Sequence, residues 1–196
     1  MILPSDYQQL NSLPDDPQGC VTYGKQTPGA LCVVSIFPIA PSEAMDFNGK
    51  EALIDGIHNS LASNQAIIEV DAGRRKSGLP YIYSLIKTHR KEEGVQYFLL
   101  MHLSIPPSRV IAIKAFFDEY GVTGVRDTNV WAMFSKARPE LSPEELQKEW
   151  FYDPYDPNFQ AQYKMNISEQ EKFDALFPDH PLSQCRQIIQ HFKENF

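Results

Sequence analysis

The chain has 196 residues, of which 42% are hydrophobic and 22% charged, values typical of a globular protein with one sizeable core. They exclude a wholly disordered chain and make two full domains a tight fit. The formal net charge of -7 opposes attraction to nucleic acid or to an anionic membrane, and no apolar run is long enough for a membrane span. We therefore expect neither as a partner.

The N-terminal residues lack the basic start and the long apolar run of a secretory signal, so we expect a cytoplasmic protein. Cys20, Cys32 and Cys185 are widely and irregularly spaced, which argues against a disulfide framework or a structural zinc site. The histidines are scattered as well, without the spacing of a metal site. We expect no metal and no cofactor.

The first third of the chain predicts a lead-in, a strand and a helix. Prolines and turn residues punctuate residues 1–28, which predicts irregular structure there. Residues 30–37 are apolar and β-branched up to Pro38, which indicates a buried strand. Asn48 can cap a helix over residues 50–62, where leucine and isoleucine recur every fourth residue.

The middle of the chain predicts an antiparallel sheet. Residues 65–72 alternate, with Ala66, Ile68 and Val70 on one side and Ile67, Glu69 and Asp71 on the other. Residues 79–88 and 95–104 flank a charged tip, as in a hairpin. The second arm is partly apolar on both faces, so we expect a central strand with layers on both sides.

The segment 109–117 leaves two interpretations open. Ser108 could cap a helix there, whereas the β-branched residues after Pro106 and Pro107 favour a return strand, which we prefer. A turn at residues 121–124 follows, and Thr123 can cap a helix that runs to about residue 136.

Beyond residue 137 the composition becomes acidic, aromatic and helical. Ser142 begins a capping box with proline at the first helical position, and Ser168 begins a second box. Pro181 opens a last helix with one apolar side. We expect an α+β sheet domain over residues 1–137, with helices flanking its antiparallel sheet. We expect residues 138–196 to form an acidic, aromatic-rich helical extension that packs on this domain as part of the same globule.

The aromatic run in this extension is the most unusual feature of the sequence. Aromatic side chains bury much area at modest entropic cost, so they can carry binding energy at an interface. They can equally pin an irregular segment to the sheet. The candidate binding residues here are Trp150, Phe151, Tyr152, Tyr155 and Phe159.

Three polar residues complete the candidate binding set. His102 lies among large residues in a predicted strand, and Arg126 and Asp127 follow a glycine turn whose backbone N–H groups favour an anion. We predict no catalytic residue. His180 and Cys185 are five residues apart, a spacing that does not stack two side chains on a helix.

The order of strand, helix, antiparallel strands and helix over residues 30–136 resembles the PsbP-like αβα sandwich. The phrases FFDEYGVTGVRD at residues 116–127 and FPDHPLS at residues 177–183 look like patterns in uncharacterised bacterial proteins. Proteins of PsbP-like fold are mostly binding or assembly factors, which implies such a role here.

Two functions follow as hypotheses. The first is a non-enzymatic interaction or assembly protein that presents its extension or a sheet face to another protein. The alternative is a small enzyme or ligand-binding protein with a pocket between sheet and helices, involving His102, Arg126 and Asp127. A homodimer formed through an edge strand or the aromatic extension is a further possibility.

Overall fold

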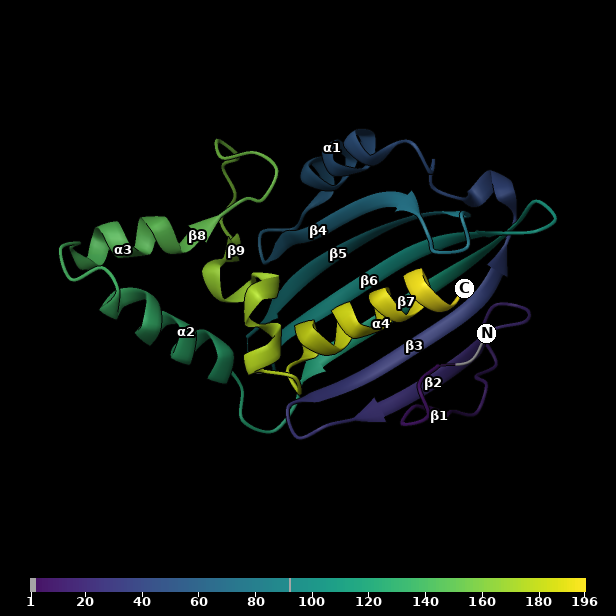
Figure 1. Ribbon diagram of the computed structural model, residues 1–196, viewed down its shortest axis with the longest axis horizontal. Coiled ribbons are helices and arrows are strands. Elements are labelled where there is room, and N and C mark those ends of the chain that lie inside the picture. Colours follow the sequence, from purple (N-terminus) through teal and green to yellow (C-terminus); the bar gives the residue numbers. More distant parts are fainter. Residues whose placement is uncertain (1–2, 92) are drawn as a thin grey trace.

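The computed structural model describes residues 3–91 and 93–196 and shows an α+β fold on a seven-stranded antiparallel sheet (Figure 1). The strand order is β1-β2-β3-β7-β6-β5-β4. The strands are β1 Gln8–Gln9, β2 Val21–Gln26, β3 Ala30–Ile39, β4 Gln65–Arg74, β5 Pro80–Arg90, β6 Gly94–Ile105 and β7 Arg109–Glu119. The predicted fold class, an antiparallel sheet with flanking helices, is confirmed.

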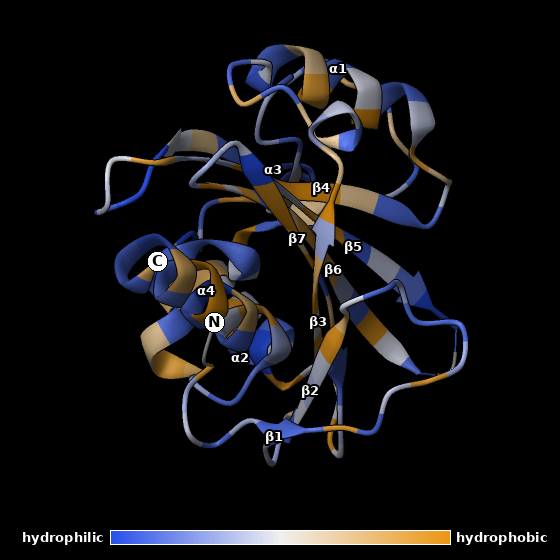
Figure 2. Cartoon of the chain, turned by 90° about the vertical axis from the view of Figure 1, so that its right-hand side faces the viewer, coloured by the Kyte–Doolittle hydropathy of each residue, from blue (hydrophilic) through white to orange (hydrophobic). Residues whose placement is uncertain are grey.

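Helices surround this sheet unevenly. The helical elements are η1 Pro41–Glu43, α1 Lys50–Ser60, α2 Val125–Lys136, α3 Pro143–Trp150, η2 Ile167–Glu169, η3 Glu171–Leu176 and α4 Pro181–Asn195. A small strand pair, β8 Phe151–Tyr152 and β9 Met165–Asn166, links α3 to η2. Helices α2 and α3 extend from one end of the sheet, and α4 lies across one face (Figures 1 and 2).

The face under α4, here called the front face, holds the main core. Inward residues of β3, β5, β6 and β7 alternate towards it, and α4 closes it with its apolar stripe. The α4 residues in this core are Leu182, Cys185, Ile188, Ile189 and Phe192. The predicted amphipathic last helix is therefore present, and it buries its stripe on the sheet.

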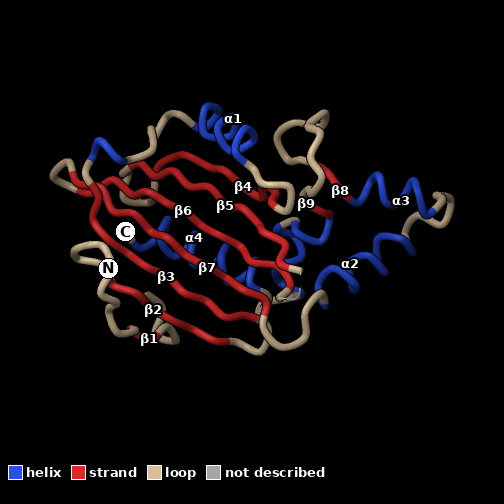
Figure 3. Tube along the Cα trace, turned by 180° about the vertical axis from the view of Figure 1, so that it is seen from behind, coloured by secondary structure: helices blue, strands red, loops and turns tan. Residues whose placement is uncertain are grey.

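The opposite face, here called the rear face, is covered only in part. Helix α1 packs on β4 through Ile57, which contacts Ile67 and Val70. The segment after β3 covers the other end, where the Met45 N–H donates to His102 Nδ1 at 2.9 Å. Between them no helix or loop of residues 3–91 and 93–196 crosses the rear face, and this uncovered part is here called bare (Figure 3). The predicted layer over both faces of β6 is therefore wrong for this part of the sheet.

Three strands differ from the prediction. The lead-in contains the two-residue strand β1, paired with β2, and the six-residue strand β2, paired with β3 although it includes Gly24. A β-bulge between Ile67 and Glu69 in β4 breaks the predicted alternation. As a result Val70 lies with Ile67 against α1, whereas Ile68 joins the front core. Residues 109–117 form part of β7, so the preferred strand interpretation is confirmed.

The residues that cap the helix N-termini agree with the prediction in one helix and differ from it in three. Helix α3 begins at the predicted Ser142 cap, whose hydroxyl accepts a hydrogen bond from the Glu145 N–H at 3.3 Å. Three other predicted N-caps are wrong. The N-caps are Gly49, Gly124 and Asn166 instead of Asn48, Thr123 and Ser168. The capping box formed by Asn166 and Glu169 opens the 3-10 helix η2, and the short helix η3 that follows is also a 3-10 helix, which ends at Leu176.

Candidate functional site

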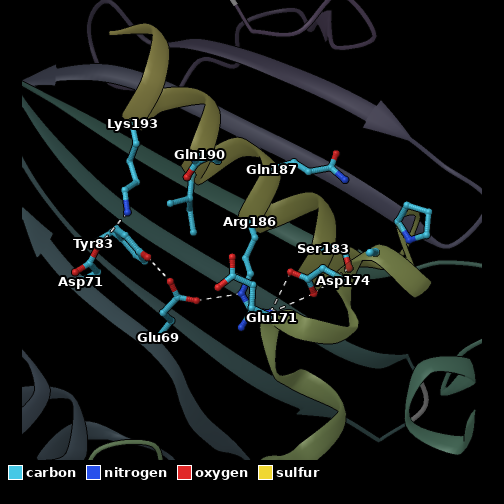
Figure 4. A pocket seen from close by; sticks show the side chains of 13 residues that line it. Glu69, Asp71, Tyr83, Glu171, Asp174, Ser183, Arg186, Gln187, Gln190 and Lys193 are labelled. Atoms are coloured by element: carbon cyan, nitrogen blue, oxygen red, sulfur yellow. Dashed lines mark hydrogen bonds and ion pairs between the residues drawn. The ribbon is translucent and has the colours of Figure 1, made fainter. Parts of the chain in front are cut away.

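A groove of about 500 Å³ lies between α4 and the front face of β4 and β5 (Figure 4). Polar side chains line most of it because the bulge in β4 turns two carboxylates towards α4. The polar lining is Glu69, Asp71, Tyr83, Glu171, Asp174, Ser183, Arg186, Gln187, Gln190 and Lys193. Four carboxylates therefore face two cations across this groove.

Ion pairs tie the two walls of the groove together. Arg186 Nε lies 3.0 Å from Glu69 Oε2, and its Nη1 lies 3.2 Å from Asp174 Oδ1. Lys193 Nζ lies 3.2 Å from Asp71 Oδ2. Burial opposes the charge of Arg186, but Asp174 and Glu69 outweigh it and raise the pKa of Arg186. Both cations of the groove are therefore already paired with its carboxylates.

Arg126, a predicted binding residue, lies fully buried behind this groove. Its Nη1 is 2.8 Å from Asp174 Oδ1 and donates to Ser183 Oγ at 2.9 Å. Its Nε donates to the Ser168 carbonyl at 2.7 Å, and its Nη2 donates to the Gln170 carbonyl at 3.1 Å. Arg126 therefore joins α2 to η2, η3 and α4, and its donors are satisfied within the chain.

A second buried polar group lies under the extension. Lys87 Nζ donates to Glu169 Oε2 at 2.7 Å, and Tyr97 Oη donates to Glu169 Oε1 at 2.9 Å. Burial disfavours the charged form of Lys87, but attraction to the Glu169 carboxylate is stronger than this effect. The pKa of Lys87 is therefore raised. Burial also raises the pKa of Tyr97. Sequence patterns gave no sign of this pair, because its members lie on separate elements.

The two phrases at residues 116–127 and 177–183 meet in space at a hollow of about 340 Å³. The Glu119 side chain occupies the glycine turn that is predicted to favour an anion. Its Oε1 accepts a hydrogen bond from the Gly124 N–H at 2.9 Å. Its Oε2 accepts from the Val95 N–H at 2.9 Å. A carboxylate of the chain itself therefore takes the place of an anion at this turn.

His180 lies between this hollow and the core and caps α4. Its Nδ1 accepts a hydrogen bond from the Leu182 N–H at 3.2 Å, which leaves the proton of the neutral ring on Nε2. Burial, with Arg126 and Arg186 nearby, lowers the pKa of His180 to about 3. This histidine is therefore neutral at physiological pH.

The other two polar candidates lie apart. His102 is buried on the rear face, and burial together with Lys114 lowers its pKa. Asp127 accepts hydrogen bonds from the Ser168 hydroxyl and from Asn166 Nδ2, on the front side of the sheet. The predicted set of His102, Arg126 and Asp127 does not converge on one cavity.

The aromatic candidates of the extension mostly contact the chain itself. Trp150 is buried against Trp131 and Phe134, and Tyr152 Oη accepts from Gln170 Nε2 at 3.1 Å. Phe159 stacks on His58 at 4.2 Å. Only Phe151 among these is exposed, at 38%. Binding of a partner by these residues stays a prediction.

Tyr155 has a more specific position at the outer edge of β4. Its hydroxyl accepts a hydrogen bond from the Val70 N–H at 2.5 Å and donates to the Val70 carbonyl at 3.0 Å. Its ring joins the small rear cluster with Ile57 and Ile67. Sequence reasoning singled out this tyrosine as an aromatic but did not foresee its contact with a strand edge.

The two buried cysteines and the metal-ligating side chains of the described residues are further possible chemical groups. Burial raises the pKa of Cys185 well above its ordinary value, and that of Cys32 to about 11, so both are neutral thiols. Across residues 3–91 and 93–196, no three His, Cys, Asp or Glu side chains are grouped to hold a metal ion. In the same described part of the chain, no helix has the length and hydropathy to cross a bilayer.

The bare part of the rear face carries a row of apolar side chains. Val33, Phe116, Phe98 and Ile86 are cross-strand neighbours on β3, β7, β6 and β5. The rings of Phe98 and Phe116 lie 5.0 Å apart, and Phe116 remains 40% exposed. Leu31, on the same face, is 41% exposed. The signal for this surface was present in the two-sided apolar pattern of residues 95–104.

No family model and no curated protein matches this chain. Among solved structures, the Ran-binding protein Mog1p of Saccharomyces cerevisiae matches with a TM-score of 0.40 and 9% sequence identity. The match covers 71% of this chain and 77% of that chain. A likeness of this degree assigns no function, and the resemblance to PsbP-like proteins stays a prediction.

Proposed function

We propose that this chain is a non-enzymatic interaction protein whose bare rear face binds an amphipathic helix of another protein. The observation that carries this proposal is the row from Val33 to Ile86, with Phe116 40% exposed at its centre. A sheet that is apolar on both faces is stable in water when a second layer covers each of them. Helix α4 supplies that layer on the front face, and a partner supplies it on the rear.

The width of the bare strip favours a single helix. From β3 to β5 the strip crosses four strands, which is about 14 Å at the usual strand spacing. A helix with its side chains is about 10 to 12 Å wide. One helix therefore fits on the rear face between α1 and strand β2, with its apolar side on Phe116 and Phe98.

Charge defines the partner further. Lys114 is exposed on the same face, two residues from Phe116, and its Nζ lies 5.7 Å from the centre of the Phe37 ring. No ion pair joins Lys114 to another residue in the described part of the chain. We infer that the partner helix carries an Asp or Glu beside its apolar stripe, facing Lys114.

The exposed apolar area of Phe116 sets the size of the effect that a change at this residue should have on binding. Covering the exposed 40% of Phe116 removes about 80 Å² of apolar surface from water and contributes roughly 2 kcal/mol. Leu31 and the half-buried neighbours add to this contribution. A single-site change at Phe116 should therefore weaken binding by about thirtyfold.

Selection of amphipathic helices from a displayed peptide library tests the proposal. We expect selected helices to share an apolar i, i+3, i+4, i+7 pattern with an acidic residue, and to bind Phe116→Asp and Lys114→Glu proteins more weakly. Val122→Asp is the matched control, because Val122 is 79% exposed but lies outside this face. Selection of no helix, or equal binding to Phe116→Asp, would overturn the proposal.

A second candidate is a ligand-binding protein that uses the groove of Figure 4, which is a pocket between the sheet and α4. Its supporting observation is the groove's size, about 500 Å³, which lies in the range of small-molecule sites. Thermal unfolding with and without a library of cationic metabolites separates the two candidates. Stabilisation that Glu69→Gln removes and Phe116→Asp leaves intact would favour the groove.

A further inference from the structure

The outer edge of β4 is closed by a side chain where another strand would otherwise bind. β4 is the last strand of the sheet, so the backbone N–H and carbonyl groups that point away from β5 need hydrogen-bond partners. The Tyr155 hydroxyl bonds both the N–H and the carbonyl of Val70. A residue of an antiparallel neighbouring strand would make the same two bonds to Val70.

The edge has room beside this contact. A hollow of about 330 Å³ lies along the end of β4, lined by Ala72, Gly73 and Arg74 and by residues before and within α1. By strand alternation, Ala72 turns its N–H and carbonyl outward in the same way as Val70. An extended segment centred on Val70 would therefore continue along the edge into this hollow.

We propose that the β4 edge is a second docking surface, which takes an extended segment of another protein with basic residues on both sides of an apolar one. The segment replaces the Tyr155 hydroxyl and adds an eighth strand to the sheet. This is β-strand addition, in which main-chain bonds give affinity and alternate side chains give specificity.

The two faces of β4 dictate the side-chain pattern. Val70 faces the rear cluster with Ile57 and Ile67, so the residue opposite Val70 places an apolar side chain where the Tyr155 ring now lies. The adjacent residues of the segment lie opposite Glu69 and Asp71 on the front side, beside the groove of Figure 4. The groove lining has two more carboxylates than cations, and Lys50 from α1, with its Nζ 3.8 Å from Asp71 Oδ1, offsets one of them, so a negative excess still favours lysine or arginine there.

The same geometry disfavours a second copy of the chain as the occupant. Antiparallel pairing of two β4 edges around Val70 would set Asp71 of one copy opposite Glu69 of the other. Like charges directly opposite one another destabilise a strand pair. Ion pairs of Asp71 with Lys193 and Lys50, and of Glu69 with Arg186, reduce this repulsion but leave none of these cations free for the partner strand.

Access to the edge requires the segment around Tyr155 to move. Besides Tyr155, this segment is held by the pair between Asp153 Oδ2 and His58 Nε2 at 3.0 Å and by the stacking of Phe159 on His58. Tyr155 thus provides hydrogen bonds to Val70 when no other strand is bound at the edge, and it competes with an incoming strand. Removing the hydroxyl should favour the partner without altering the sheet.

Fluorescence anisotropy with a labelled peptide Ser-Lys-Val-Lys-Ser, acetylated and amidated, tests the proposal on the full chain. We expect measurable binding to the natural protein and about tenfold tighter binding to Tyr155→Phe, because the competing hydroxyl is gone. Tyr152→Phe is the matched control and should bind as the natural protein does. Phe116→Asp should also leave this binding unchanged, which keeps the test separate from rear-face docking.

Two altered peptides and one exchange measurement complete the design. A Glu-Val-Glu peptide should not bind, and N-methylation of the central valine should abolish binding by removing its N–H. Hydrogen exchange at the Val70 amide should be faster in Tyr155→Phe while other core amides stay protected, which shows an intact fold. Unchanged affinity in Tyr155→Phe, or retained binding of the N-methylated peptide, would overturn the proposal. Dimerisation of Tyr155→Phe in place of peptide binding would also overturn it.

Discussion

The two faces of the sheet are built by the same strands but meet different surroundings. Phe117 points to the front, where α4 covers it completely, and its neighbour Phe116 points to the rear and is 40% exposed. The front face also holds buried charges that are paired within the chain. Side chains on the front therefore secure the fold, whereas those on the rear are available for a partner.

The largest expected effect comes from truncating these two neighbours separately. Phe117→Ala should lower the free energy of unfolding by about 4 kcal/mol, because it leaves a cavity in the core. Phe116→Ala should lower it by about 1 kcal/mol, mainly through the lost contact with Phe98. Urea denaturation of both variants measures the difference. Equal losses would mean that the faces do not differ as described.

A smaller loss is expected from breaking the buried pair on the front face. Glu169→Ala removes the partner of Lys87 and Tyr97 and should cost about 3 kcal/mol, because a buried charge is left unpaired. The double variant Lys87→Met with Glu169→Gln removes that charge and should cost less than Glu169→Ala alone. Urea denaturation measures both, and a double variant that is less stable than Glu169→Ala would contradict the account.

The pH dependence of stability tests one buried side chain on the front side of the sheet, His180. His180 has a pKa of about 3 in the folded protein, below its ordinary value, so the unfolded chain binds this proton more readily. Stability should therefore fall between about pH 6.5 and pH 3, by roughly 1 kcal/mol per pH unit.

The control for this effect is His180→Asn, which keeps an acceptor for the Leu182 N–H but cannot be protonated. This variant should have a flatter stability profile between pH 6.5 and pH 3 than the natural protein. Chemical denaturation at a series of pH values provides the comparison. An unchanged slope would assign the acid sensitivity to other groups.

Much of the sheet was predictable because its strands carry their own signal. β-branched and alternating residues define β3, β5 and β6, and the charged tip between β5 and β6 indicates their hairpin. β2 escaped prediction because Gly24 and polar residues hide a strand that β3 stabilises by pairing. The bulge in β4 was also hidden, since an extra residue changes the faces without changing the composition.

The surfaces with functional interest were harder to predict than the elements. The groove joins Glu69 and Asp71 to side chains of α4, and only the docking of α4 on the sheet brings them together. The contact of Tyr155 with Val70 likewise depends on the path of an irregular segment. Arg126 seemed suited to an anion, but the sequence does not show that Asp174 lies 2.8 Å away.

The pairing of β3 with β7 has a consequence for how the protein folds. β1 to β3 form one meander and β4 to β7 another, each joining strands that are consecutive in the chain. The seam between them pairs Ala30 with Glu119 and requires closure of a long loop. We expect each meander to assemble quickly and the seam to set the rate at which the complete sheet appears.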